Sequence, residues 1–383
     1  MKVVHDAALA PRTSLGVGGS ARRLVLLETL DEAEHELARI DEPFYLLGGG
    51  SNVVIADEGL FETVLSLQAR GLAFRELGGD ATRGEVELTA AAGEPWDALV
   101  AACVERGLGG LECLSGIPGL VGATPIQNVG AYGQEVADCV SGVRIFDLRA
   151  REVRELARAE CRFAYRDSDF KSGTLRGRAV VLAVRYRLRR GAPAAPRYGE
   201  LSRALERDVG AAASDGDKLR ATRQTVLALR AAKGMLIADD ARARDGDSRS
   251  AGSFFLNPVV SCAEADAVQA RARALGALGA DEAMPRFGAG RDGHDKLAAA
   301  WLIERAGFHK GYGEGAVGLS SKHTLALINR GGARGADVVA LALEIQRGVE
   351  QRLGVRLHPE PQLLGFAPDN GLAAPATPML PGS

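Results

Sequence analysis

The sequence has no uninterrupted apolar stretch near the roughly 20 residues that a membrane-spanning helix needs. Its first residues, MKVVHDAALAPRTS, also lack the apolar region of a signal peptide. Neither sign of charge dominates, since 47 Lys and Arg stand against 49 Asp and Glu without a long run of one sign. Such a balance argues against nucleic acid or a membrane surface as the partner. We therefore expect a cytoplasmic protein that binds a small molecule.

Recognisable disulfide and metal patterns are missing as well. The five cysteines are odd in number, widely spaced and without a C-x-x-C pair. The six histidines show neither H-E-x-x-H nor H-x-H spacing. We expect buried, reduced thiols and no metal site. The cysteines are Cys103, Cys113, Cys139, Cys161 and Cys262.

Length and apolar patterning indicate a multi-part α+β protein. At 383 residues the chain is longer than one hydrophobic core usually serves, so two or three packed units are expected. Short apolar runs such as VELTAA, VSGVRIFDL and AVVLAVRYRL predict strands in the first half. The second half is richer in helical patterns, among them DKLAAAWLIERAG and SCAEADAVQARARALGAL, the latter opening on a Ser261/Glu264 capping box. The last residues, APDNGLAAPATPMLPGS, predict a disordered tail.

Three segments match the dinucleotide fingerprint G-x-G-x-x-G/A, and they begin at Gly16, Gly288 and Gly313. The fingerprint binds a pyrophosphate only where a strand enters the glycine turn and a helix leaves it. None of the three has that context, because they follow PRTSL, EAMPRF and LAAAWLIERAGFHK. A Rossmann domain is therefore not expected.

Two other glycine-rich segments are better candidates for a ligand site. The segment LGGGSN, Leu47 to Asn52, joins two strand-like runs. Its N–H groups could cradle a phosphate, although a plain tight turn fits equally well. The segment GIPGLVGATPIQNVGAYG, Gly116 to Gly133, suits neither a helix nor a continuous strand. Its backbone can approach a flat or anionic ligand closely, and Asn128 offers both a donor and an acceptor.

The longer stretch GLECLSGIPGLVGATPIQNVGAYG resembles the flavin-binding core of the UDP-N-acetylenolpyruvoylglucosamine reductases. The resemblance covers nearly everything from TSLGVGG to HPEPQLLGF. RYGEL is similar to the tyrosine loop of the longer branch of this family. One departure is Ala123, where many members have a second glycine, and another is a longer loop after Gly234. The other motifs that carry the resemblance are LGGGSN, CRFAYRDSDFK, AGSFFLNPVV, KLAAAWLIERAG, SKHTLALIN and the PE of HPEPQ.

The resemblance implies an α+β fold in which two N-terminal subdomains of the vanillyl-alcohol-oxidase type hold FAD noncovalently. A third, substrate-binding subdomain follows them. The expected boundaries are 1–70 and 71–240 for the two FAD-binding subdomains, 241–354 for the substrate-binding domain, 355–366 for a return segment and 367–383 for the tail. The residues expected at FAD are Gly48, Gly49, Gly50, Ser51, Asn52, Gly116, Ile117, Pro118, Gly119, Gly122, Ala123, Asn128, Gly130, Ala131, Tyr132 and Gly133.

The implied reaction is the reduction of UDP-N-acetylglucosamine enolpyruvate to UDP-N-acetylmuramate in peptidoglycan precursor synthesis. NADPH reduces the flavin, flavin N5 gives a hydride to the methylene carbon, and the adjacent carbon receives a proton. Negative charge then builds on the substrate carboxylate. The family motifs make Arg166 the stabilising cation, Ser253 the proton donor and Glu360 the enol stabiliser. Without the family, these would be read as a surface charge, a cap and a loop acid.

Four further residues are implied at the substrate. Tyr198 would fold over the uridine diphosphate, and Lys233, Asn257 and Lys296 would contact the sugar or the diphosphate. Each also has an ordinary interpretation, because Asn257 precedes a proline in a natural turn and the lysines flank helices. We expect the protein to be a monomer.

Two alternatives stay open at this point. One is another flavin oxidoreductase of the same fold, although the flavin segments hold no His of the kind that often tethers FAD in such enzymes. The other is a noncatalytic flavoprotein that binds a nucleotide sugar. Such a binder would be expected to lack some of the three catalytic residues, and all three are present.

Overall fold

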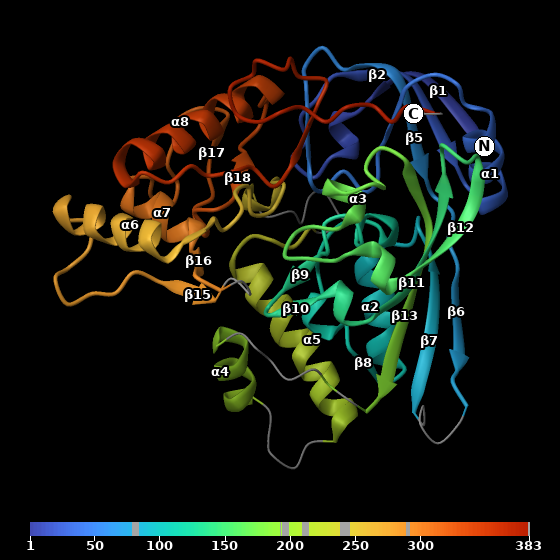
Figure 1. Ribbon diagram of the computed structural model, residues 1–383, viewed down its shortest axis with the longest axis horizontal. Helices are drawn as coiled ribbons and strands as arrows, with labels where there is room; N and C mark the ends of the chain where they lie inside the picture. Colours follow the sequence, from blue (N-terminus) through green and yellow to red (C-terminus); the bar gives the residue numbers. More distant parts are fainter. Residues whose placement is uncertain are drawn as a thin grey trace.

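The computed structural model describes residues 1–78, 84–191, 193, 199–208, 214–237, 246–288 and 292–381. Figure 1 shows three neighbouring parts: an N-terminal sheet in blue, a larger central sheet with helices beside it, and a C-terminal lobe in orange and red. The chain then returns from the last lobe to the first. This arrangement matches the α+β expectation.

The N-terminal part is a four-stranded sheet in the order β1-β2-β5-β3. Strands β2, β5 and β3 run parallel, and helix α1 connects β2 to β3. The Thr29 hydroxyl caps α1 by accepting from the N–H of Glu32, as the sequence pattern predicts. The elements are β1 (Lys2–Ala8), β2 (Ser20–Leu27), α1 (Leu30–Arg39), β3 (Phe44–Leu46), β4 (Val53–Ile55) and β5 (Leu60–Leu67).

The central part is an antiparallel sheet in the order β12-β11-β13-β7-β6, with the short β8 also pairing with β13. Its core holds Trp96 and Tyr186, both fully buried with ring centroids 6.1 Å apart. The elements are β6 (Leu72–Glu76), β7 (Glu85–Ala91), α2 (Trp96–Glu105), β8 (Leu108–Gly109), β9 (Gly130–Ala131), β10 (Gln134–Glu135), β11 (Val140–Asp147), β12 (Glu152–Ala157), α3 (Asp169–Ser172), β13 (Ala179–Arg190), α4 (Gly199–Asp208) and α5 (Asp215–Ala232).

The C-terminal lobe packs three helices around small sheets. The Ser261/Glu264 capping box at the start of α6 is confirmed. The run DKLAAAWLIERAG is only partly helical, because its first three residues pair in strand β16 instead. The elements are β14 (Val259–Ser261), α6 (Cys262–Ala274), β15 (Arg286–Gly288), β16 (His294–Leu297), α7 (Ala299–Arg305), β17 (Val317–Leu319), β18 (Leu327–Asn329) and α8 (Gly335–Leu353).

The chain returns to the N-terminal part through β19 (Gln362–Leu364), which pairs in parallel with β4. The carboxylate of Asp57 accepts the N–H groups of Gly335 and Ala336 at the start of α8. Both contacts hold the C-terminal lobe against the N-terminal part. They bring Glu360, just before β19, close to the glycine segment that precedes β4.

Residues 367–381 are not the disordered tail that the composition predicts. Leu372 is 2% exposed in the core of the C-terminal lobe. Phe44 and Met379 exchange two backbone hydrogen bonds of 3.1 and 2.7 Å, which extend the edge of the N-terminal sheet. The prediction was wrong because composition does not show the long-range backbone hydrogen bonds that hold this segment against Phe44 and Leu363.

The cysteines are unpaired, and four of the five are buried. Burial raises the pKa of Cys103, Cys113, Cys139 and Cys161 to about 12, so these thiols stay protonated at neutral pH. The expectation of burial was wrong for Cys262, which is exposed in the first turn of α6. Among the described residues, no group of His, Cys, Asp and Glu is arranged to hold a metal ion. None of the described helices combines the length and the apolar character needed to cross a membrane.

Candidate active site

A cavity of about 910 Å³ lies where the three parts meet. Both glycine segments line it, and so do Arg166, Ser253 and Glu360. The volume falls in the range of cofactor and ligand sites. Three side chains that are widely separated in the sequence therefore face one space.

The glycine segment Gly48–Asn52 touches the second glycine segment backbone to backbone. A Cβ on Gly49 would lie 2.7 Å from the Cα of Gly119, so only glycine fits there. A Cβ on Gly122 would lie 2.6 Å from the Cβ of Ala92. The two loops thus form a wall of exposed peptide groups, which suits a phosphate or the face of a flat ring.

Ala123, the departure from the family pattern, fits without strain. It ends a short 3-10 helix, and its Cβ lies 3.8 Å from the place where a Cβ on Gly48 would stand. Gly48 has no Cβ, so the exposed Ala123 methyl group meets no side chain there. The methyl group therefore leaves the loop as it is.

A partly buried network of hydrogen bonds holds the start of the second glycine segment. The N–H of Gly116 donates to Asp97 at 2.5 Å, and Asp97 also accepts two hydrogen bonds from Arg223. The Arg230 guanidinium donates to the carbonyl of Gly116 at 3.0 Å and lines the cavity. Burial lowers the pKa of Arg230, but a guanidinium keeps its charge at neutral pH.

Several residues predicted at FAD lie behind this wall and do not line the cavity. Asn128 is the clearest correction, since it is 1% exposed and its side chain is fully used within the protein. Its amide donates to Glu135 at 2.6 Å and to the carbonyl of Ala164 at 2.9 Å, and its oxygen accepts from Ala137. The five residues that do not line the cavity are Gly116, Gly119, Asn128, Tyr132 and Gly133; the other eleven line it.

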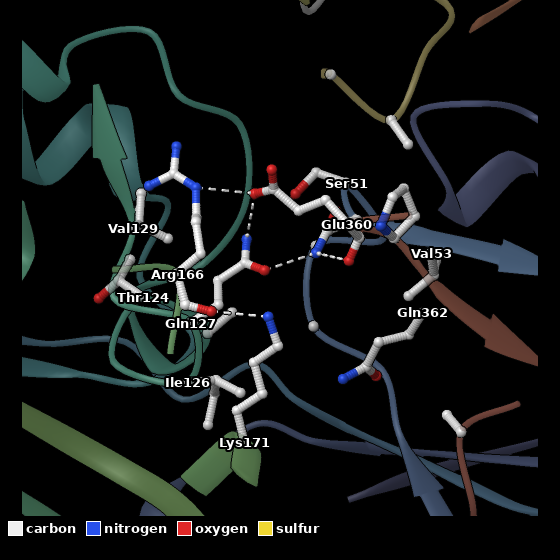
Figure 2. A pocket seen from close by; sticks show the side chains of 18 of the residues that line it. Ser51, Val53, Thr124, Ile126, Gln127, Val129, Arg166, Lys171, Glu360 and Gln362 are labelled. Atoms are coloured by element: carbon white, nitrogen blue, oxygen red, sulfur yellow. Dashed lines mark hydrogen bonds and ion pairs between the residues drawn. The ribbon is translucent and has the colours of Figure 1, made fainter. Parts of the chain in front are cut away.

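Arg166 and Glu360 form an ion pair at the edge of the cavity, with 3.1 Å between Nε and Oε1 (Figure 2). Their side chains are only 22% and 13% exposed. Arg166 also donates from Nη2 to the carbonyl of Gly130 at 2.6 Å. Its φ of 51° lies in the left-handed region, and the Nζ of Lys171 donates to its carbonyl at 2.7 Å. Lys171 therefore helps to hold an unfavourable backbone conformation.

Glu360 is tied to both sides of the cavity. Its N–H donates to the carbonyl of Phe254 at 2.8 Å, which places it beside Ser253. Burial raises the pKa of the Glu360 carboxyl, while Arg166 and Lys171 oppose that rise by stabilising the ionised form. The same burial lowers the pKa of Lys171.

Gln127 positions the Glu360 carboxylate through a chain of amides (Figure 2). The Nδ2 of Asn52 donates to the Oε1 of Gln127 at 3.0 Å, which fixes the orientation of that amide. The Nε2 of Gln127 then faces Glu360 and donates to its Oε1 at 3.3 Å. Asn52 also donates to the backbone carbonyl of Glu360 at 3.3 Å. Three segments far apart in the sequence are joined in this way.

Ser253 lines the cavity in the loop whose Phe254 carbonyl accepts from the N–H of Glu360. The next two residues, Phe254 and Phe255, are fully buried with rings 5.3 Å apart, so they anchor the loop. Gly252 has a φ of 72°, which favours glycine. No hydrogen bond joins the Ser253 hydroxyl to another residue in the part of the chain that the structure describes. The hydroxyl is therefore not a helix cap and is available to a ligand.

The predicted substrate contacts are only partly brought together. Asn257 lines the cavity, but its Oδ1 accepts from the N–H of Ala299 at 2.9 Å. The Nζ of Lys296 lies 4.3 Å from the ring centre of Tyr165, which itself lines the cavity. Lys233 does not line the cavity and pairs with Glu200 at 2.6 Å. Tyr198 lies outside the described residues.

Sequence reasoning missed three residues at this site: Gln127, Tyr165 and Lys171. Each belongs to a motif that was recognised, PIQN or YRDSDFK, but none has a chemical type that stands out. The sequence offered one indication: each is a polar residue close to a residue that the motifs had already identified. Their distances to Arg166 and Glu360 depend on the fold, so spacing alone could not identify them.

Comparisons with known proteins agree with this site. Residues 244–364 match the family model described as UDP-N-acetylenolpyruvoylglucosamine reductase, C-terminal domain, and residues 24–155 match that of an FAD binding domain. The chain is 46% identical over 365 residues to the UDP-N-acetylenolpyruvoylglucosamine reductase of Thermobifida fusca, covering 94% of this chain and 98% of that protein. It is 47% identical over 369 residues to the enzyme of that name from Streptomyces coelicolor, covering 95% and 91%. The crystal structure of the Thermus caldophilus reductase matches with a TM-score of 0.61 and 26% identity, covering 95% of this chain and 98% of that one.

Proposed function

The chain belongs to the UDP-N-acetylenolpyruvoylglucosamine reductase family, and on that premise we propose the reaction that its site performs. It reduces UDP-N-acetylglucosamine enolpyruvate to UDP-N-acetylmuramate, with FAD as the redox cofactor and NADPH as the hydride source, in peptidoglycan precursor synthesis. One observation carries the proposal. Arg166, Glu360 and Ser253 meet on one cavity whose other wall is made of two glycine segments. The cytoplasmic location and the monomeric state remain predictions.

The cavity wall fits FAD in shape and chemistry. The backbone of Gly48–Asn52 offers N–H groups for the diphosphate, and the three glycines have no side chains to cover them. Ile117, Pro118 and Ala123 add apolar surface for a flat ring. When bound, FAD would supply the hydride that this chain lacks.

Arg166 would bind the carboxylate of the substrate. Guanidinium is permanently charged and has five N–H donors. Within the described chain, Nε faces Glu360 and Nη2 donates to Gly130, so further donors are available to a carboxylate. In a partly buried site this interaction strengthens as negative charge builds on the carboxylate.

Glu360 would stabilise the enol, and Ser253 would donate the proton. Burial raises the pKa of Glu360, so its carboxyl can share a proton with a developing enolate more readily than an exposed one. The Ser253 hydroxyl is a weak acid, and it can protonate only a strongly basic carbon. The hydrogen bond from the N–H of Glu360 to the Phe254 carbonyl would keep the two groups near each other on the cavity.

The test is a two-step experiment without oxygen. NADPH is expected to bleach the flavin absorbance of the purified protein, and UDP-N-acetylglucosamine enolpyruvate is then expected to restore it with formation of UDP-N-acetylmuramate. Restoration only by oxygen, and not by this substrate, would refute the proposed reaction. Restoration by UDP-N-acetylglucosamine, which lacks the enolpyruvyl group, would refute the proposed site of reduction.

A further inference from the structure

Arg166 occupies a position in a tight turn that ordinarily favours glycine. Ala164 and Asp167 exchange two backbone hydrogen bonds of 3.0 and 3.1 Å, which close the turn over Tyr165 and Arg166. Arg166 is the one of these two with a positive φ. A tight turn with a positive φ at its second central residue usually has glycine or asparagine there. The direction in which the Arg166 side chain leaves the turn therefore depends on the groups that hold this conformation.

Lys171 is one of these groups, and it acts from within the cavity. Its Nζ donates to the Arg166 carbonyl at 2.7 Å (Figure 2). Lys171 lines the same cavity as Arg166 and is half-buried. A lysine side chain usually keeps its ammonium group in water. Here the ammonium group is instead bonded to the main chain of the residue proposed to bind the substrate carboxylate.

The support that carries Lys171 is itself anchored. Lys171 lies in the short helix α3, and the next residue toward the N-terminus, Phe170, is 5% exposed in the core of the central part. Just before α3, the Ser168 hydroxyl donates to the carbonyl of Ile126 at 2.5 Å, which ties the helix to the second glycine segment. The position of the Lys171 backbone is therefore set by the fold.

Lys171 also acts on Glu360 through its charge. Of the described charged groups, Arg166 and Lys171 are the two that oppose the effect of burial on the Glu360 carboxyl. Glu360, Asp167 and Arg166 in turn are the charged groups that act on Lys171. The Asp167 carboxylate accepts from the hydroxyl of Ser172 at 2.7 Å, so it is already held by α3. Charges interact more strongly in a partly buried site than in water.

Resting on the proposed function, we infer that Lys171 is a positioning residue for the reduction of the substrate. Its hydrogen bond fixes the turn from which the Arg166 guanidinium reaches the substrate carboxylate. Its positive charge sets the pH at which Glu360 gains or loses its proton. Both effects act through other residues, so Lys171 does not need to touch the substrate.

The test is Lys171→Met, which removes the ammonium group and keeps an unbranched side chain. We expect kcat/KM for the enolpyruvyl substrate to fall by about 10- to 100-fold, the equivalent of losing one hydrogen bond from a charged group. The limb of the pH profile that belongs to Glu360 should move to higher pH by about one unit, because a cation that stabilises the ionised carboxylate is gone. Steady-state kinetics across the pH range measure both.

Reduction of the flavin by NADPH and the affinity for FAD should be unchanged in Lys171→Met, since the inferred role belongs to the second step. Lys171→Arg keeps the charge and the donors, so its limb should stay at the wild-type pH. In a Glu360→Gln background the limb is absent, and adding Lys171→Met should move nothing. Arg162→Met is the matched control, because it removes a cation of the same motif whose side chain is 73% exposed and outside the cavity. It should keep the wild-type profile.

A loss of activity in Lys171→Met without movement of the limb would overturn the inference, because a merely structural role gives that result. Equal movement of the limb in Lys171→Arg would overturn it as well. If Lys171→Met does not fold, Lys171→Gln takes its place, since it keeps an N–H donor and loses the charge; its limb is expected to move in the same direction. A wild-type protein whose reduced flavin is not reoxidised by the enolpyruvyl substrate would instead refute the proposed function.

Discussion

Two parts of the cavity wall are built in opposite ways. In one part, Arg166 and Glu360 are partly buried charges joined at 3.1 Å and held by amides from distant loops. In the other part, residues 373–377 carry no charge and are held by backbone hydrogen bonds. An ion pair that binds a ligand needs two particular side chains at matched positions. A neutral wall needs only a suitable shape, which many small residues supply. Sequence motifs can therefore identify the ion pair, but they cannot identify the neutral wall.

This difference predicts that changes at the reacting end alter the reaction and leave FAD binding intact. The largest effect is expected for Ser253→Ala. Loss of the proton donor should slow reduction of the substrate by about 10² to 10⁴-fold, the usual scale for a general acid. Reduction of the flavin by NADPH should be unchanged, because Ser253 has no part in it. Stopped-flow absorbance measures both steps, and an equal slowing of both would contradict the assigned role.

Arg166→Lys is expected to have the next largest effect. Lysine keeps the charge but lacks the planar fork that binds a carboxylate with two hydrogen bonds. We expect kcat/KM for the enolpyruvyl substrate to fall by about 10²-fold, or ~2.7 kcal/mol, with FAD affinity unchanged. Steady-state kinetics and flavin titration provide the two readouts.

Arg162→Lys is the control for the backbone conformation. Arg162 has a φ of 44°, close to the 51° of Arg166, but its side chain is 73% exposed and lies outside the cavity. If Arg166→Lys acts only by removing the guanidinium that binds the substrate carboxylate, Arg162→Lys should keep full activity. A loss as large as that of Arg166→Lys would show that the backbone turn, and not the substrate carboxylate, explains the effect.

Gln127→Leu tests whether the hydrogen bond from Gln127 lowers the pKa of Glu360. The Gln127 N–H stabilises the ionised carboxylate, so its removal raises the pKa of Glu360 further above its ordinary value. The limb of the pH profile that belongs to Glu360 should therefore move to higher pH, and activity at neutral pH should change by about 10-fold. Glu360→Gln identifies that limb by abolishing it. A profile that only drops in height, without moving, would mean that Gln127 is merely structural.

The sequence motifs indicated three residues that line the cavity but few of the residues that hold them in place. Arg166, Ser253 and Glu360 came from motifs, and the structure places all three on the cavity. Asn128 was misjudged, because a polar residue in a glycine-rich loop suggests a ligand contact when in fact it closes the loop on itself. Local patterns also identified the capping box of α6. The three residues of DKL entered a strand because pairing with β14 and β15, invisible in the local pattern, outweighed helical propensity.

The smallest effect is expected for a substitution at Ala123. A comparison with its neighbour Gly122 shows which changes in the cavity wall are tolerated. Ala123→Gly removes an exposed methyl group that lines the cavity, so FAD affinity should change by less than about fourfold, the equivalent of one CH₂ group. The free energy of unfolding should fall by ~0.4–1 kcal/mol, because glycine gains freedom in the unfolded chain. Its neighbour provides the contrast. Gly122→Ala would bring a Cβ to 2.6 Å from that of Ala92, and overpacking of this kind costs ~1–3 kcal/mol. Denaturant unfolding and FAD titration of the two variants measure the difference, and a strong loss of FAD affinity in Ala123→Gly would show that the methyl group itself contacts the cofactor.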